Sequence, residues 1–96
     1  MAVLSLTALG VLGFAGPAAA DAPQIVKATF KGLDSAQGNA MCPDGSHAIS
    51  GGVGSPNEVA VVTASHPTPD GKGWHGHITR SGHVIQANVY VLCQTD

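Results

Sequence analysis

Apolar and polar residues alternate over short stretches of this chain after residue 20, and no window repeats apolar residues at the three- and four-residue spacing of a helix. Gly and Pro interrupt the pattern at intervals too short for a helix of ordinary length. The pattern predicts an all-β domain, a small antiparallel β-sandwich or partly open barrel of about six short strands. The expected strands are Gln24–Phe30, Gln37–Cys42, Ala48–Val53, Val59–His66, Trp74–Arg80 and His83–Gln94.

Residues 1–20 follow a different pattern, because they carry no charge, run apolar and end in small residues before Asp21. These features are typical of a secretory signal peptide, so we expect a single secreted, extracellular β domain at residues 21–96. An uncleaved membrane anchor is the alternative, but Gly and Pro dilute the apolar run that an anchor needs. The first basic residue is Lys27, so the basic n-region that usually begins a signal peptide is missing. A start codon upstream of Met1 would explain this departure.

The last two expected strands flank Ser81-Gly82, a pair typical of a two-residue hairpin turn. A two-residue turn at this pair sets a pairing register in which the apolar residues of both strands lie on one face. Trp74 lies on that face and is therefore predicted to be a core anchor. The opposite face collects polar side chains, and we expect it to contact water or a ligand. The predicted partners are Arg80–His83, Ile78–Ile85, Gly76–Ala87 and Trp74–Val89. The predicted binding face carries His75, His77, Thr79, Gln86 and Asn88.

The chain has few large apolar side chains after residue 20 and only 4 % aromatic residues overall, which predicts a thin core. Its two cysteines, Cys42 and Cys93, are therefore interpreted as one disulfide formed in an oxidising compartment, with free thiols as the alternative. The chain-entropy model gives a bond that closes so long a loop about 4 kcal/mol of stabilisation. A cysteine in a disulfide has no free thiolate, so it cannot act as a nucleophile or as a metal ligand.

The charge balance limits the partners. The chain has four Lys and Arg residues and six Asp and Glu residues, a formal net charge of −2. This balance does not indicate the excess of basic residues that binds nucleic acid or an anionic membrane surface. Partners expected of an exported domain of this kind are cell-wall polysaccharide or another extracellular protein.

His75 and His77 are the strongest candidates for a metal site, since alternate residues of a strand point the same way. Their backbones lie about 6.5 to 7 Å apart, a spacing that Zn or Cu sites on strands use. A third ligand would have to come from His47, His66, His83 or a carboxylate. Exposed histidines without a metal are the ordinary alternative.

Catalytic motifs are missing. Ser46 and His47 are adjacent, so on a strand they face opposite sides and cannot form a dyad, and there is no Gly-x-Ser-x-Gly elbow. We therefore expect a protein that is not an enzyme. Gly51-Gly52 inside an expected strand indicates a bulge, a positive φ angle or the close approach of another segment rather than a phosphate loop.

One segment between expected strands is rich in proline and has the stiffness of a recognition loop: Pro67, Thr68, Pro69 and Asp70. An ordinary connection stiffened against proteolysis is the alternative. A stiff loop supported by a disulfide would also suit a secreted protease inhibitor.

The order of short motifs resembles that of small secreted β modules frequent in actinobacteria, which read Cys-Pro-x-Gly, Gly-Gly, Ser-x-Pro, Gly-Trp and a final aromatic-apolar-Cys strand. The matching segments here are 42–45, 49–52, 64–67, 73–74 and 88–93. The resemblance implies an extracellular β domain with its two cysteines bonded and with no established activity. The leading hypothesis is a secreted, non-enzymatic binding module; the alternatives are an extracellular metal-binding protein and a protease inhibitor.

Overall fold

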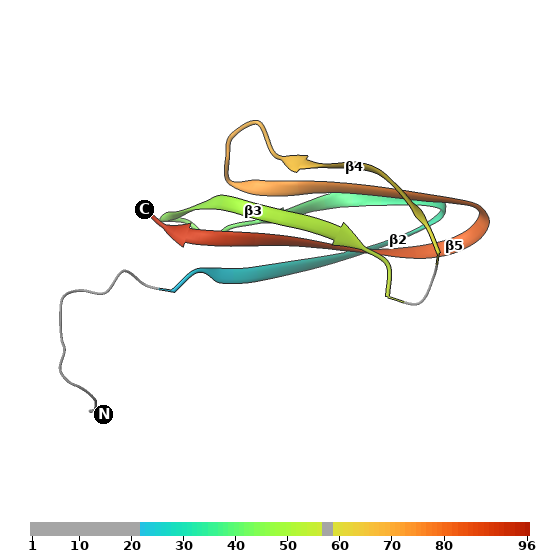
Figure 1. Cartoon of the computed structure of the whole chain (residues 1–96), viewed down its shortest axis with the longest axis horizontal. Helices are drawn as coiled ribbons and strands as arrows, with labels where there is room; N and C mark the ends of the chain where they lie inside the picture. The colour runs from blue at the N-terminus through green and yellow to red at the C-terminus, as the bar shows by residue number, and fades with distance from the viewer. Residues whose placement is uncertain (1–21, 57–58) are drawn as a thin grey trace, which may run out of the picture.

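The described chain is one antiparallel β-sheet (Figure 1). The computed structural model describes residues 22–56 and 59–96, so the predicted signal peptide at residues 1–20 lies outside the described residues. No α-helix occurs in the described ranges, which confirms the all-β prediction. The four strands are β2 (Gln24–Met41), β3 (Ser46–Gly54), β4 (Val61–Pro67) and β5 (Gly73–Thr95).

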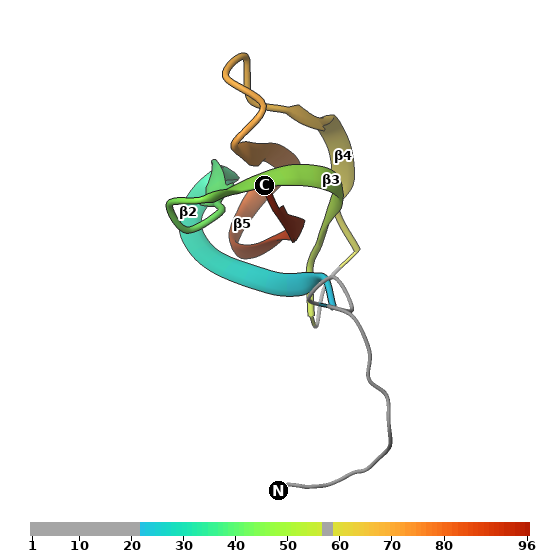
Figure 2. The same cartoon turned by 90° about the vertical axis from the view of Figure 1, so that its left-hand side faces the viewer.

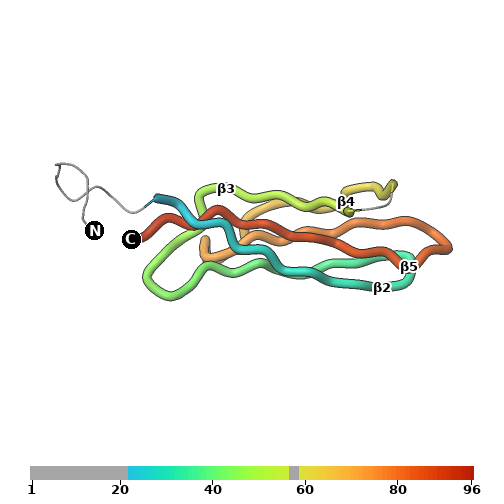
Figure 3. The backbone as a smooth tube through the Cα atoms, turned by 90° about the horizontal axis from the view of Figure 1, so that it is seen from below, coloured from blue at the N-terminus to red at the C-terminus, as the bar shows by residue number. Residues whose placement is uncertain are grey.

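Two of these strands are long and fold back on themselves at the same end of the molecule (Figures 1 and 3). β2 covers both of the first two predicted strands except Cys42, and β5 covers both of the last two. β2 bends at Asp34, whose φ angle is 66°, and β5 bends around Gly82, whose φ angle is 77°. The Gly82 amide donates a hydrogen bond of 2.7 Å to Asp34 Oδ1, which joins the two bends.

Folding back divides the sheet into two layers that pack face to face, as the end-on view in Figure 2 shows. The β3 layer consists of residues 24–33 of β2, residues 84–95 of β5, and β3. The β4 layer consists of residues 35–41 of β2, residues 73–79 of β5, and β4. The prediction of about six short strands was therefore right about the extended segments. It missed that two pairs of them are continuous through a bend.

The core lies between the layers, where glycines accept large side chains from the opposite layer. Gly38 lies under the Phe30 ring, and a Cβ added there would overlap that ring. A Cβ at Gly76 would stand 2.7 Å from Val53 and 2.9 Å from Val89. The layers can approach this closely only because glycine has no side chain. The buried apolar residues are Ala36, Ala40, Ile78, Ile85, Ala87, Val89, Val91 and Cys93.

The predicted hairpin register of β5 is wrong. Ile78 pairs with Ala36 of β2 and Val62 of β4, while Ile85 pairs with Gly32. Both hydrogen-bonding edges of residues 74–79 are thus occupied, and no edge remains for residues 83–94. Ile78 and Ile85 instead belong to one core cluster between the layers, and each is 1 % exposed. Packing layer on layer buries both residues, whereas a flat hairpin would leave one face of the sheet open.

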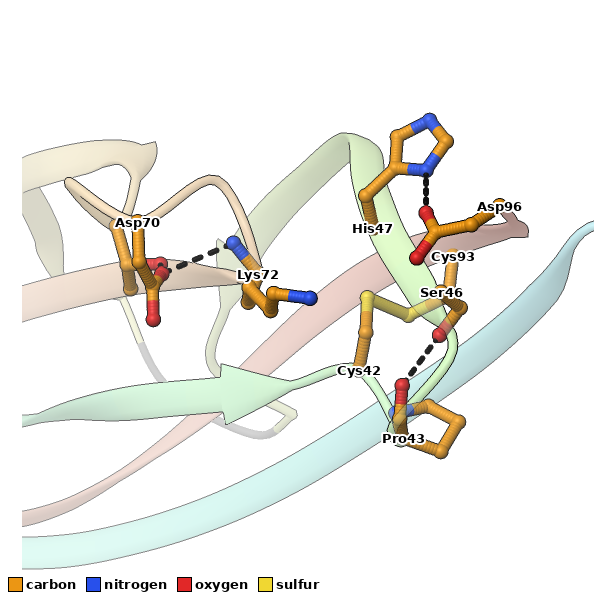
Figure 4. The surroundings of a disulfide bond; sticks show 9 residues. Cys42, Pro43, Ser46, His47, Asp70, Lys72, Cys93 and Asp96 are labelled. Carbon is orange, nitrogen blue, oxygen red and sulfur yellow. Dashed lines mark hydrogen bonds and ion pairs between the residues drawn. A yellow bond between two sulfur atoms is a disulfide. The ribbon is translucent and has the colours of Figure 1, made fainter.

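The predicted disulfide joins Cys42, just after β2, to Cys93 near the end of β5, with the two Cα atoms 5.7 Å apart (Figure 4). Cys93 is 3 % exposed and belongs to a core cluster. The bond therefore closes the end of the sheet opposite the two bends, with Cys93 on the buried side of β5.

Candidate functional site

The outer surface of the β3 layer carries a compact polar group at its centre, which we name the amide face: Thr29, Gln86, Asn88 and Tyr90. Thr29 Oγ1 donates to Asn88 Oδ1 at 3.0 Å, and Gln86 Nε2 donates to the same oxygen at 3.1 Å. These bonds fix the orientation of the Asn88 amide, which is 8 % exposed. Tyr90 follows Asn88 on the same face and is 38 % exposed. The amide face therefore combines oriented amides with an accessible aromatic ring.

Glycines on β3 keep the space beside this face open. Gly52 is the ladder partner of Tyr90, and Gly54 is the partner of Asn88. A Cβ added at either glycine would meet no atom within 4 Å. Gly51 differs from its neighbour, because it faces inward and a Cβ there would overlap the Trp74 indole. The Gly51-Gly52 pair is thus explained by a close approach at the first glycine, and neither glycine has a positive φ angle.

The amide face is bordered by positive charge. Lys27 pairs with Tyr90, and Lys31 pairs with Gln86, both from β2 and both exposed. The three ladder rows that run through Lys27, Thr29 and Lys31 contain no carboxylate. The face therefore offers amide and hydroxyl groups beside ammonium groups, a set that suits a polyhydroxylated ligand and repels no anion.

The predicted single polar face is split between the two layers. Gln86 and Asn88 face outward from the β3 layer, while His75, His77 and Thr79 face outward from the β4 layer. The bend at Gly82 separates the two groups, so they lie on opposite sides of the molecule. The predicted binding face is divided for the same reason that the predicted hairpin register is wrong. When β5 folds over at Gly82, residues that would share one side of a flat hairpin face outward from two different layers.

The outer surface of the β4 layer carries what we name the histidine face: Asn39, His66, His75 and His77. His66 and His75 are ladder partners on β4 and β5, and their ring centroids lie 5.2 Å apart. His75 Nδ1 lies 2.7 Å from Asn39 Oδ1, and His66 Nδ1 lies 2.9 Å from the Pro67 carbonyl oxygen. His66 and His75 therefore form a cross-strand pair of imidazoles in ring contact.

The predicted metal ligands His75 and His77 do share a face, but the Nε2 atom of His77 is buried without a hydrogen-bond partner in the described part of the chain. Of the predicted third ligands, His66 lies beside His75. His47 pairs instead with Asp96 at 2.6 Å, and His83 lies exposed at the bend. Within residues 22–56 and 59–96, no three His, Cys, Asp or Glu side chains are grouped to hold a metal.

The proline-rich segment forms a tight turn with its own hydrogen bonds. Thr68 Oγ1 donates to Asp70 Oδ1 at 2.6 Å, and the Lys72 amide donates to the same oxygen at 2.9 Å. These bonds hold the pKa of the Asp70 carboxyl below its usual 3.8, with the Thr68 hydroxyl the larger cause. Of the predicted recognition residues, Pro67 ends β4, Thr68 is 7 % exposed, and Pro69 and Asp70 are exposed.

This turn also lies against the disulfide end of the sheet (Figure 4). The Cys42 amide donates to the Lys72 carbonyl at 2.8 Å, and the Ala48 amide donates to the Gly71 carbonyl at 2.9 Å. The segment thus connects the end of β2 to β3, which gives it a structural role whether or not it also contacts a partner.

The Ser46 and His47 side chains separate as the strand parity predicted. The Ser46 hydroxyl is buried and donates to the Pro43 carbonyl at 2.6 Å, while His47 is exposed beside Asp96 (Figure 4). A hollow of about 480 Å³ adjoins this end of the molecule, and Asp44 is the one titratable side chain among its described lining residues. The described residues bring no nucleophile and base together there.

Comparison with known proteins adds nothing further: no family model, curated protein or solved structure matches this chain. The resemblance to small secreted actinobacterial β modules therefore stays a prediction. No helix in the described ranges has the length and hydropathy of a membrane span.

Sequence reasoning missed three features of these surfaces. Thr29 joins Asn88 from a strand 59 residues away, so local alternation could not place it there. Tyr90 was assigned only to a terminal motif, although its parity with Gln86 and Asn88 places all three on one face. Asn39 lies in the expected strand Gln37–Cys42, and its pairing with His75 depends on the register between β2 and β5.

Proposed function

We propose that this protein is a secreted, non-enzymatic binding module whose amide face contacts a polysaccharide of the cell envelope. The observation that carries the proposal is the arrangement at Asn88, where Thr29 and Gln86 orient an amide beside the accessible Tyr90 ring. Amides of fixed orientation donate to and accept from sugar hydroxyls, and a tyrosine ring offers an apolar face together with a polar hydroxyl.

The openness of the face supports the same function. Gly52 and Gly54 have no side chain and leave open space beside Tyr90 and Asn88, which gives a sugar ring room at these two positions. The Cys42–Cys93 disulfide supports an extracellular setting, since such bonds persist in oxidising compartments. An exported protein is the other class of partner, and the test below separates the two.

The protease-inhibitor alternative receives less support. The Thr68 amide donates to the Gly73 carbonyl and the Gly71 amide donates to the Thr68 carbonyl, both at 2.9 Å. The segment that would enter a protease cleft is therefore a closed turn whose backbone groups are engaged with one another.

Retention of the tag-free protein on purified cell-wall fractions and on glycan arrays tests the proposal. Tyr90→Ala removes the ring, and Gly52→Val places a branched side chain beside it at a position where the Cβ meets no atom within 4 Å. We expect each variant to bind polysaccharide at least about tenfold more weakly, which corresponds to about 1.4 kcal/mol. Thr79→Ala is the matched control, because Thr79 lies in the same strand but faces outward from the other layer.

The outcomes separate the alternatives. Retention that disappears when the fractions are treated with protease identifies an exported protein as the partner. Absence of retention on every fraction, together with blank arrays, contradicts the proposal. So does a Thr79→Ala loss as large as that of Tyr90→Ala.

A further inference from the structure

The cross-strand pair His66 and His75 has its tautomers fixed by neighbouring oxygen atoms. The Pro67 carbonyl oxygen can only accept a hydrogen bond, so His66 Nδ1, at 2.9 Å, must carry the proton. Asn39 turns its amide oxygen, an acceptor, toward His75 Nδ1 at 2.7 Å, and this orientation matches a proton on that nitrogen. In the neutral rings both Nε2 atoms therefore hold an unshared electron pair.

This is the arrangement that metal-bound histidines adopt. A ligating imidazole almost always donates its other ring N–H to an oxygen, which sets the ring orientation and raises the basicity of the ligating nitrogen. Two adjacent rings that both have such an oxygen partner on Nδ1 form a pair prepared for a shared cation.

The spacing of the rings agrees with a shared ion. Two imidazoles bound to one zinc through nitrogen at about 2.0–2.1 Å, with a tetrahedral angle between them, have ring centroids about 5 Å apart. The His66 and His75 centroids are 5.2 Å apart. His66 is exposed and His75 is half-buried, so solvent can reach the pair and complete the coordination.

The ligand type selects the metal. Imidazole nitrogen suits zinc, copper and nickel, whereas magnesium and calcium prefer oxygen ligands. The described residues group no three metal-ligating side chains, so the protein would supply two ligands and water the others.

We propose that His66 and His75 form a two-imidazole site for Zn²⁺ or Cu²⁺ on the outer surface of the β4 layer, with Asn39 as a positioning residue for His75. The site differs from the predicted His75–His77 pair, since its second ligand comes from β4. It lies on the layer opposite the amide face and does not depend on the proposed glycan binding.

Calorimetry with ZnCl₂ and CuCl₂ on tag-free protein tests the site. We expect one ion per chain for the parent protein and at least about tenfold weaker binding for His66→Gln and for His75→Gln. His77→Gln is the matched control, because His77 shares the face while its Nε2 atom is buried; its affinity should stay within about twofold of the parent. Asn39→Val should weaken binding severalfold without changing the stoichiometry.

An NMR measurement of the imidazole ¹⁵N shifts gives a readout that a purely structural role would not move. Without metal, His66 and His75 should both show the tautomer protonated at Nδ1, and zinc should shift their Nε2 resonances and leave that of His77 in place. Equal affinity of the parent and both ligand variants overturns the proposal. A loss in His77→Gln as large as in His75→Gln, or absence of binding in the parent, overturns it too.

Discussion

The two layers of the folded sheet complement each other on the inside and differ on the outside. Gly38 and Gly76 of the β4 layer accept Phe30, Val53 and Val89 of the β3 layer, whereas Trp74 of the β4 layer lies over a glycine of β3. The outer surface of one layer carries oriented amides and a tyrosine, and that of the other carries histidines. A chain with few aromatic residues can thus close its core by placing glycines opposite its large side chains, and it keeps two chemically distinct surfaces.

Removing the disulfide should give the largest effect, because the bond fastens the end of the sheet opposite the bends. The chain-entropy model for a separation of 51 residues predicts a loss of about 4 kcal/mol in the free energy of unfolding. Urea denaturation of Cys42→Ser/Cys93→Ser beside the oxidised parent measures it. Coincident midpoints would show that packing between the layers holds the sheet closed without the bond.

The complementarity between the layers predicts a coupled pair at Gly38 and Phe30. Gly38→Ala places a Cβ into the Phe30 ring and should destabilise the protein by about 1–3 kcal/mol through overpacking. Phe30→Leu in the same chain removes part of the clash, so the double variant should be more stable than the sum of the single changes implies. A double-mutant cycle from denaturation curves measures the coupling, and additive single effects would contradict the fit.

The adjacent glycines Gly51 and Gly52 of β3 test the difference between the inner and the outer face of the β3 layer, because the first faces inward and the second outward. Gly51→Ala overlaps the Trp74 indole and should cost about 1–3 kcal/mol. Gly52→Ala meets no atom within 4 Å and should leave stability unchanged or raise it by up to about 1 kcal/mol, since alanine restricts the unfolded chain. Thermal unfolding of the two variants side by side is the measurement. Equal midpoints would mean that the inner and outer faces of β3 are assigned incorrectly.

Asp70 should give the smallest effect on stability, and the dependence of this effect on pH should appear only in acid. Its pKa is held below 3.8 in the folded protein, so its ionised form favours folding above that value. This contribution is lost as the pH falls through the lowered pKa of the folded state. Asp70→Asn keeps an oxygen acceptor but does not titrate, so the stability gap between parent and variant should narrow between pH 5 and pH values below 3.8. A gap that is independent of pH would contradict this role.

The sequence predicted local features well and long-range pairing poorly. Strand positions follow from alternation, and the two cysteines had one possible partner each. The bend at Asp34 needs Gly32, where a Cβ would overlap the Ser35 carbonyl oxygen, and Asp34 also accepts a hydrogen bond from Gly82, 48 residues away. The turn signal at Ser81-Gly82 was genuine, but a turn signal does not say whether its flanking strands pair with each other or with other strands.

The same limit applies to the candidate sites. The inward parity of Ile85, Val89 and Cys93 was predictable, because it needs only one strand. The pairing of His66 with His75 was not, because a bulge between Val62 and Ala64 shifts the register of β4 by one residue. Surfaces built from side chains of several strands require the register, and local sequence does not specify it.

A map of amide chemical shifts tests most directly whether the two outer surfaces bind separate ligands. One ¹⁵N-labelled, tag-free sample is titrated with soluble cell-wall polysaccharide and then with ZnCl₂. We predict that polysaccharide shifts the amides of Gly52, Gly54 and Tyr90 and leaves β4 unchanged, and that zinc then shifts His66 and His75. Polysaccharide shifts confined to the β4 layer, or both ligands acting on one layer, would contradict this assignment.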